Sequence, residues 1–267
     1  MPGRSKYSKK KSENLKRKSE SQKRKKARSS AKKKGGSKKR LLKEEKHYEY
    51  SELESPDEKK KIIDKILEIY PDERLDLKFS SPFELLVSAI FAAQAKDEVV
   101  NSATEKLFQK YKSPEDFANL KPEDLKDYVS KINFWYKKSQ TVINVSKEII
   151  EKYQGKVPDS VDELVKIKGI GRKTANMVVG GAYGKPAIIV DTHLMRVSQR
   201  LGLVDEGLSP EEIEFKLKEI VPEEVQTKFS FALIRHGKKV CHAKNPDCQI
   251  CELKKLCRWY KASFKYT

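Results

Sequence analysis

The sequence predicts an all-α protein. Serine-led helix start signals recur between Ser55 and Ser209, and apolar residues follow them at the three-to-four-residue spacing of amphipathic helices. The only strand-like run is Ala187–Val190, which is four residues long. A chain of 267 residues is long enough for one large domain or two small ones, each with a buried core.

The N-terminal tail carries most of the charge. Residues 1–40 hold 19 of the 58 Lys and Arg residues and two of the 39 Asp and Glu residues, so they account for +17 of the net charge of +19. Five apolar residues in this stretch cannot offset the entropy lost on ordering. We therefore expect residues 1–46 to be a disordered Lys/Arg-rich tail that adds phosphate contacts, acts as a nuclear import signal, or only solubilises the chain.

Helix starts in the body share one pattern. Ser55, Ser81 and Ser209 are each followed by proline and, three residues after the serine, by glutamate, which predicts a capped N-terminus at each site. Ser113 begins a weaker version with aspartate, and Ser160 begins a capping box without proline. The signals predict helices along most of the body.

Residues 83–95 stand out among the predicted helices because they are apolar on almost every side. A helix without a polar face is buried on all sides. We expect this segment to be a central helix of the core.

Two glycines mark a tight turn between two further helices. A helix that begins near Ser160 is expected to end at Gly169, and a second helix to start near Arg172. Ile170 lies between Gly169 and Gly171 and is expected to plug the core. Such a turn presents backbone N–H groups to a phosphate, although an ordinary helix–helix turn has the same pattern.

Lys173 is placed in the first turn of this second helix, where the helix dipole disfavours a positive charge. The position suits an amine that acts as a nucleophile, and a merely solvated lysine is the alternative. Asp191 follows 18 residues later, directly before Thr192. Its carboxylate could cap a helix or take part in chemistry.

The four cysteines have the spacing C-x6-C-x2-C-x5-C within 17 residues. So compact a set is not a disulfide framework for a chain of this size and indicates a reducing compartment. Four thiolates suit either tetrahedral Zn²⁺ or a [4Fe–4S] cluster, and the ligand type leaves both open. The predicted ligands are Cys241, Cys248, Cys251 and Cys257.

Together, the hairpin Lys168–Asn176, the segment Val190–Val197 and the cysteine string resemble endonuclease III of the helix-hairpin-helix DNA glycosylase superfamily. The resemblance covers about residues 56–260 and leaves the tail outside. It implies a six-helix barrel domain over 75–185, with the helix-hairpin-helix at about 160–184, and an iron–sulfur domain built from 56–74 and 186–267. It also implies that the cysteines hold a [4Fe–4S] cluster.

The same resemblance implies the chemistry. Lys173 would attack the anomeric carbon of a damaged nucleotide, displace the base, form a Schiff base and cleave on the 3′ side by β-elimination. Asp191 would help to activate the lysine and stabilise positive charge on the sugar. Relatives that remove adenine carry a small residue in place of the lysine, so Lys173 favours lyase activity.

An enzyme that acts on a base must take it out of the duplex and fill the gap. The resemblance assigns the filling glutamine to Gln94 and the apolar wedge to Phe134. Here the chain departs from its relatives, because Asn133-Phe134-Trp135-Tyr136 is bulkier and lacks their glycine; core packing is the alternative for Trp135. Further predicted DNA contacts are Lys168, Gly169, Gly171, Arg172, His193 and Lys244.

We therefore predict a bifunctional DNA glycosylase/AP lyase that removes oxidised pyrimidines from duplex DNA in base excision repair. The alternatives are a mismatch thymine or uracil glycosylase of the same fold and a noncatalytic DNA-binding protein with structural zinc. No stretch approaches 18 apolar residues and no apolar segment follows the charged N-terminus, so we expect neither a membrane span nor a secretory signal. We expect a DNA-associated monomer inside the cell, in the nucleoid of a prokaryote or the nucleus of a eukaryote.

Overall fold

The computed structural model describes residues 54–264, which contain α-helices, short 3-10 helices and no β-strand. The all-α prediction is confirmed for this part of the chain. The predicted disorder of residues 1–46 lies outside the described residues. None of the described helices is both long and apolar enough to cross a bilayer.

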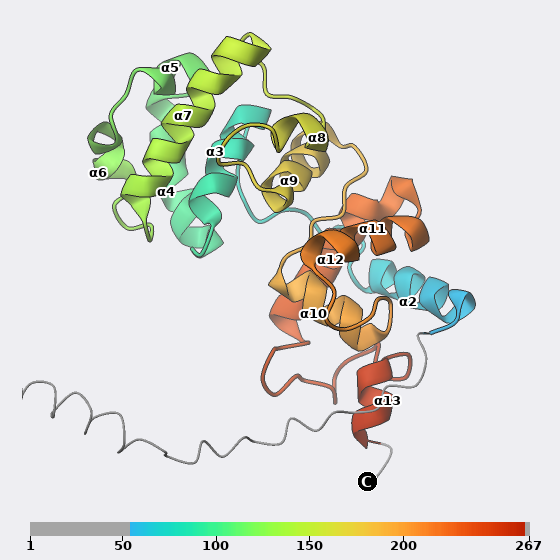
Figure 1. Cartoon of the computed structure of the whole chain (residues 1–267). Helices are drawn as coiled ribbons and strands as arrows, with labels where there is room; N and C mark the ends of the chain where they lie inside the picture. Colours follow the sequence, from blue (N-terminus) through green and yellow to red (C-terminus); the bar gives the residue numbers. More distant parts are fainter. Residues whose placement is uncertain (1–53, 265–267) are drawn as a thin grey trace, which may run out of the picture. The chain divides into compact units, whose positions relative to one another are not determined.

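A first lobe gathers around α3, the helix predicted to be central (Figure 1). Every residue of α3 from Phe83 to Phe91 is buried, as its apolar sequence predicts. The elements of the first lobe are α3 (Pro82–Ala92), α4 (Asp97–Lys110), α5 (Pro114–Ala118), η1 (Pro122–Leu125), α6 (Lys126–Val129), α7 (Trp135–Tyr153), α8 (Val161–Leu164) and α9 (Arg172–Tyr183).

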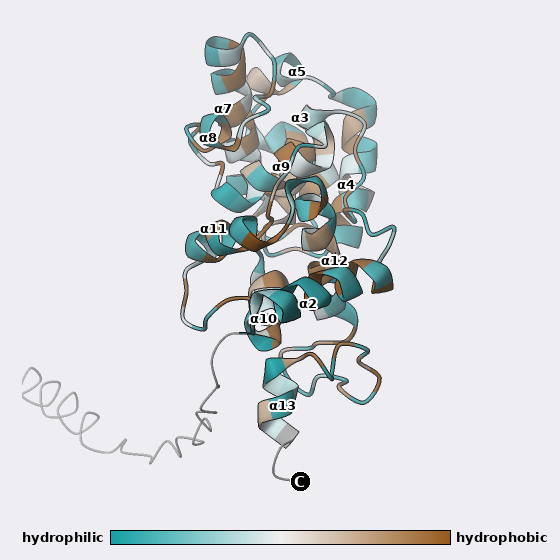
Figure 2. Ribbon diagram, turned by 90° about the vertical axis from the view of Figure 1, so that its right-hand side faces the viewer, coloured by the Kyte–Doolittle hydropathy of each residue, from teal (hydrophilic) through white to brown (hydrophobic). Residues whose placement is uncertain are grey.

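A second lobe combines the first described helix with the C-terminal part of the chain. Helix α2 buries Ile62, Ile63 and Ile66 against this lobe and turns a hydrophilic side outward (Figure 2). The predicted domain boundaries at 74/75 and 185/186 stay a prediction. The elements of the second lobe are α2 (Pro56–Ile69), α10 (Thr192–Leu201), α11 (Pro210–Ile220), η2 (Glu223–Val225), α12 (Gln226–Lys239) and α13 (Arg258–Phe264).

Helix α12 joins the two lobes. Leu233 belongs to the core of the second lobe, whereas Phe231 belongs to that of the first. Ile234 packs against both cores. The lobes are therefore held together by an apolar seam along α12.

Most of the predicted serine caps are confirmed. Ser55, Ser113 and Ser209 form complete capping boxes, and Ser81 accepts a hydrogen bond from the backbone N–H of Glu84. These bonds satisfy N–H groups that have no partner within the first helical turn.

The prediction of a capping box at Ser160 is wrong. Ser160 makes no side-chain cap bond, and α8 ends at Leu164, before the expected end at Gly169. The Glu163 carboxylate pairs instead with Lys166 at 2.5 Å and accepts a hydrogen bond from the Tyr153 hydroxyl at 3.2 Å. The glutamate that would have closed the box is drawn to other partners.

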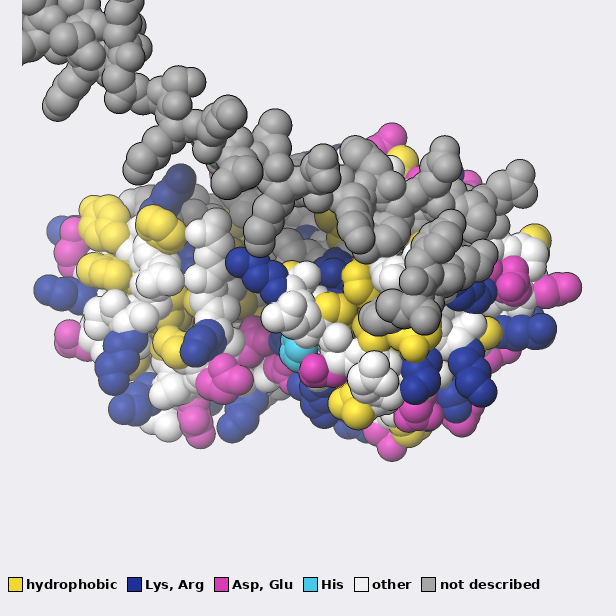
Figure 3. Space-filling model, turned by 90° about the horizontal axis from the view of Figure 1, so that it is seen from below, with side chains coloured by type: hydrophobic (Ala, Val, Ile, Leu, Met, Phe, Trp, Pro, Cys, Tyr) yellow, Lys and Arg dark blue, Asp and Glu magenta, His cyan; other side chains and the backbone are white. Residues whose placement is uncertain are grey.

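The described surface has no strong single-sign region on the side shown in Figure 3, where basic and acidic side chains are interspersed. Residues 41–267 carry a net charge of only +2.

Candidate active site

A cavity of about 320 Å³ lies between the lobes and receives side chains from both. Lys173 reaches it from α9, and Asp191 and His193 reach it from the start of α10. Gln94 lines it from the end of α3. Four of the sequence-predicted site residues are thus brought together in one hollow.

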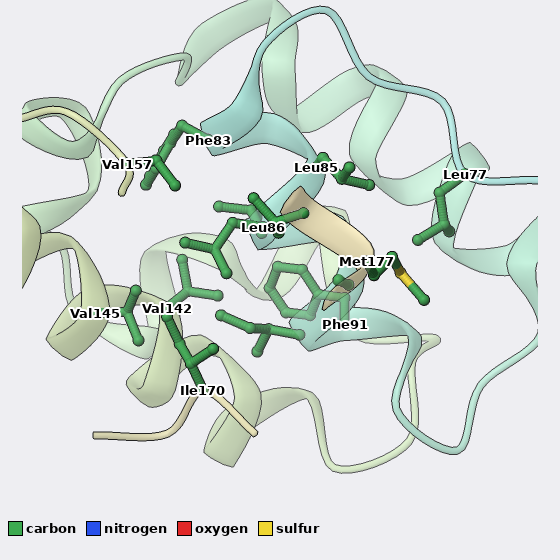
Figure 4. Packing of buried hydrophobic residues seen from close by; sticks show 14 of the residues in the cluster. Leu77, Phe83, Leu85, Leu86, Phe91, Val142, Val145, Val157, Ile170 and Met177 are labelled. Carbon is green, nitrogen blue, oxygen red and sulfur yellow. The ribbon is translucent and has the colours of Figure 1, made fainter. Parts of the chain in front are cut away.

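The hairpin that carries Lys173 is fixed from behind by packing. Ile170 is 5% exposed and points toward Val142 and Val145 of α7 (Figure 4). Gly169 has a φ of 105°, and a Cβ there would lie 2.7 Å from a methyl carbon of Thr141. Only glycine fits this position, because the backbone is left-handed and α7 is too close.

Gly171 has a different reason to be glycine. Its φ is −88°, and a Cβ added to it would meet no atom within 4 Å. It is the N-cap of α9 and provides no side-chain acceptor for the first-turn N–H groups. An open glycine before uncapped N–H groups suits the approach of an anionic ligand.

Asp191 caps α10, as one of its two predicted roles requires. Its Oδ1 accepts hydrogen bonds from the backbone N–H groups of His193 at 2.9 Å and Leu194 at 2.7 Å. Among the described residues no donor is bonded to Oδ2. One oxygen thus holds the carboxylate in place and leaves the other for chemistry in the cavity.

His193 lies on the same edge of the cavity, with its Nδ1 3.3 Å from Nη2 of Arg196. Arg196 also donates to the carbonyl oxygens of Gly237 and Cys241. The Arg196 side chain therefore ties the start of α10 to α12 and to the cysteine segment.

The guanidinium of Arg172 points toward the second lobe and pairs with a carboxylate there. Its Nε and Nη2 donate to the two carboxylate oxygens of Glu214 on α11, at 2.8 and 3.0 Å. Glu214 is 2% exposed and also accepts from Asn176 and Lys218. The donors predicted to contact DNA are engaged in a buried pair that links the two lobes.

Gln94 and Phe134 lie on neighbouring loops. Both have left-handed backbones, with φ values of 55° and 58°, and Phe134 is 69% exposed. Asn133 donates its side-chain amide to the Gln94 carbonyl oxygen at 3.4 Å. Trp135 is half-buried against the first lobe, which agrees with its core-packing alternative.

A buried lysine holds this pair of loops. The Lys138 ammonium on α7 donates to the carbonyl oxygens of Phe91 at 2.9 Å and Ala93 at 2.5 Å, at the end of α3. Burial lowers the pKa of Lys138 below its ordinary value. The positive charge sits where the last carbonyls of α3 would otherwise lack partners.

The four cysteine side chains line a second, largely apolar cavity beside His236. Arg200 Nη1 lies 3.3 Å from Cys241 Sγ, and His236 Nε2 lies 3.6 Å from Cys251 Sγ. Burial raises the pKa of the Cys257 thiol to about 12. A set of thiols that is buried at Cys257 and partly buried elsewhere, with a guanidinium and an imidazole beside it, fits a group that converts thiols into bound thiolates.

In residues 54–264, no three Cys, His, Asp or Glu side chains converge as ligands of one metal ion.

Lys244 is exposed on the segment between Cys241 and Cys248, beside Asn245, whose φ is 50°. This segment is thus open to a partner, as predicted for a DNA contact.

Sequence reasoning missed the charged wall of the first cavity. Asp76 precedes α3, and Arg235 and Lys238 lie one turn apart on α12. None of these residues belongs to a sequence motif that we recognised. Only the folded chain brings positions 76 and 235 together.

Comparisons with known proteins agree with this geometry. Residues 87–223 match the model of the HhH-GPD superfamily base excision DNA repair proteins. Endonuclease III of Bacillus subtilis strain 168 is 44% identical over 196 residues, which cover 73% of this chain and 90% of that protein.

Solved structures give the same result. A trapped endonuclease III–DNA covalent intermediate has a TM-score of 0.75 at 37% identity and covers 79% of this chain and 99% of that one. A thermostable thymine-DNA glycosylase has a TM-score of 0.71 at 24% identity, covers 77% and 97% of the two chains, and shows a shared fold only. The chain therefore belongs to the endonuclease III family of the HhH-GPD superfamily and is a DNA glycosylase and AP lyase of base excision repair.

Proposed function

We propose that this enzyme removes oxidised pyrimidines from duplex DNA and then cleaves the strand with Lys173 as its nucleophile. The observation that carries this proposal is the convergence of Lys173 and Asp191, from separate lobes, on one cavity. The cavity is large enough to hold a base turned out of the duplex.

The Lys173 amine attacks C1′ of the damaged nucleotide, and the bond between C1′ and the base breaks, so that the base leaves with the bonding electrons and takes up a proton. The C1′–O4′ bond then breaks, O4′ takes up an amine proton, and the nitrogen lone pair forms the C=N bond of a Schiff base between Nζ and C1′. Removal of a C2′ proton then expels the 3′ phosphate, which is β-elimination. Positive charge builds on the sugar in the first step, and the Asp191 carboxylate stabilises it.

Three other regions hold the duplex open. Phosphate oxygens bind N–H groups of Gly169 and of residues 171–173, where Gly171 leaves room for them. Gln94 and Phe134 fill the space left by the extruded nucleotide, and Lys244 contacts the backbone. Arg172 acts through Glu214 by fixing the first turn of α9, and His193 borders the cavity near the phosphates.

The four residues Cys241, Cys248, Cys251 and Cys257 fit a [4Fe–4S] cluster, because their thiols line one cavity and cysteine thiolates are the usual ligands of such a cluster. Such a cluster is larger than a zinc ion and binds its thiolates at separate irons. When bound, it supplies cross-links between the C-terminal segment and α12.

We also propose that the enzyme acts as a monomer, at the DNA inside the cell.

The test is borohydride trapping on a duplex that contains a single thymine glycol. Borohydride reduces a Schiff base to a stable covalent adduct, so the enzyme is expected to become linked to the strand. The adduct is expected to disappear in Lys173→Ala and to persist in Lys166→Ala, a change at a hairpin lysine that pairs with Glu163. Base release without any adduct would refute the lyase mechanism. An adduct formed by Lys173→Ala would refute the assignment of Lys173 as the nucleophile.

A further inference from the structure

One wall of the active-site cavity is a chain of ion pairs that the chemistry at Lys173 does not use. The Asp76 carboxylate accepts from Arg235 through Oδ1 and from Lys238 through Oδ2, the latter at 2.8 Å. Arg235 also pairs with Glu73, and Lys238 pairs with Asp97 at 2.8 Å. All five side chains line the cavity.

The charges on this cavity do not suit a phosphate. Its four carboxylates, which include Asp191, are matched by four Lys and Arg side chains, which include Lys173 and Arg74. A phosphate needs a surplus of positive charge or of free N–H donors. The occupant that faces this wall is therefore a neutral group.

The rest of the lining indicates what kind of neutral group fits. Met177, Phe231, Ile234 and Leu77 contribute apolar surface to the same cavity. Apolar surface combined with a few convergent polar groups is typical of a site for a small ring compound. The base of an extruded nucleotide is such a ring.

The order of the polar groups specifies an edge of that ring. Asp76 lies between Arg235 and Lys238 at the centre of the chain of ion pairs, which ends in Glu73 and Asp97, so this centre presents a donor, an acceptor and a donor. Burial raises the pKa of Asp76, but hydrogen bonds from Lys238 and Arg235 outweigh it and bring that pKa below its ordinary value. The carboxylate is thus an acceptor at neutral pH, and its two oxygens have further lone pairs.

The complementary edge is acceptor, donor, acceptor. A 2,4-dioxopyrimidine has this order in O2, N3–H and O4, and oxidation of its 5,6 bond leaves the edge intact. Resting on the proposed function, we propose that Asp76, flanked by Arg235 and Lys238, binds the imide edge of the extruded base and selects oxidised thymine and uracil over 4-amino lesions. A 4-amino pyrimidine places an acceptor at N3, opposite the carboxylate.

Abasic DNA provides the discriminating substrate, because it contains no base to be read but still reacts with Lys173. Asp76→Asn keeps the size of the side chain and removes its charge. We expect single-turnover base release from a thymine glycol duplex to fall about 10- to 100-fold, the loss typical of a charge-assisted hydrogen bond. Borohydride trapping on an abasic duplex is expected to change less than threefold.

A modified base tests the contact itself. A thymine glycol methylated at N3 has no donor for Asp76, so the unaltered enzyme should lose a similar factor on it and Asp76→Asn should lose nothing further. The matched control is Asp159→Asn, which breaks a 2.6 Å pair with Lys185 outside the cavity and should affect neither reaction.

Two results would overturn the inference. Equal losses in base release and abasic trapping for Asp76→Asn would make the ion pairs a clamp between the lobes. Full activity of the unaltered enzyme on the N3-methyl base would show that no hydrogen bond from N3–H to Asp76 contributes to base release. Failure of the proposed function is a separate result, because the unaltered enzyme would then neither release thymine glycol nor form an adduct.

Discussion

The hairpin and the cysteine segment are both irregular, yet they obtain their shapes in opposite ways. At the hairpin, Ile170 is buried in the first lobe and Gly169 fits against Thr141, so contacts within the protein set the loop. Between Cys241 and Cys257, Leu253 is the one fully buried aliphatic side chain, and the thiols surround a cavity. We therefore expect the shape of the cysteine segment to depend on the group that we propose the cysteines bind.

The hairpin and the cysteine segment should therefore affect different properties of the enzyme, the first its reaction rates and the second its stability. A loop held by packing can keep an exposed lysine in one place before substrate arrives, which shortens the search for the reacting geometry. A segment held by a cofactor contributes stability when it is loaded. Changes in the hairpin should therefore alter rates at constant stability, and changes at the cysteines should alter stability first.

The sharpest form of this comparison is Lys173→Ala. Removal of the nucleophile should reduce both base release and strand cleavage by at least about 10³-fold, because the other amine of the cavity, Lys238, is paired with Asp76 and Asp97. Because Lys173 is exposed, its truncation should leave the melting temperature and the DNA affinity nearly unchanged. Single-turnover cleavage and fluorescence anisotropy measure the two effects, and retained lyase turnover would contradict the assignment.

Asp191→Asn tests whether a helix cap also serves chemistry. Asparagine caps a helix about as well as aspartate, so α10 should keep its start and the protein its stability. Loss of the negative charge should slow base release by about 10²- to 10³-fold. Thermal melts, binding titrations and single-turnover rates taken together decide the point. Equal losses of binding and rate would assign Asp191 to capping alone.

Cys257→Ser addresses the other region. Cys257 is buried, and a serine is close to it in size while ligating iron poorly. We expect the iron content to fall and the free energy of unfolding to drop by about 3 kcal/mol, which lowers the melting temperature by roughly 6–12 °C. Iron analysis and calorimetry measure these changes. Full iron content at an unchanged melting temperature would remove Cys257 from the ligand set.

Glu214→Gln tests the link between the hairpin helix and the second lobe. It leaves the Arg172 guanidinium, 26% exposed, without its carboxylate. Breaking a buried pair costs about 3–5 kcal/mol, and the partial exposure of Arg172 reduces this to about 2 kcal/mol. Urea unfolding measures the loss. The control is Glu163→Gln, which breaks an exposed pair with Lys166 and should lower the free energy of unfolding by less than about 0.5 kcal/mol. Equal losses in the two variants would mean that the pair of Arg172 and Glu214 does not link the lobes.

The smallest effect is expected from the tail, whose residues lie outside the described part of the chain. Deleting residues 1–40 removes a net charge of +17 and should weaken DNA binding mainly at low salt. The slope of log affinity against log salt should flatten by about 0.9 for each phosphate that the tail neutralises. Binding titrations at several salt concentrations measure it, and an unchanged slope would leave the tail without this role.

Much of the molecule followed from the sequence because its signals are local. The capping boxes at Ser55 and Ser209, the buried helix α3 and the burial of Ile170 each depend on residues a few positions apart. The lysine of the hairpin and the cysteine spacing could be recognised for the same reason. Ser160 shows the limit of such local signals, since distant Tyr153 competes for the glutamate of its box.

Tertiary structure alone decided the surroundings of the chemistry. Asp76 and Arg235 are 159 positions apart, and Arg172 meets Glu214 across 42 positions. No periodicity or motif records such pairs, because each residue has ordinary neighbours in the sequence and gains its partner only when the lobes close on α12. The sequence by itself indicated the residues that we propose for the reaction, and the packing of the two lobes determined the cavity that they line.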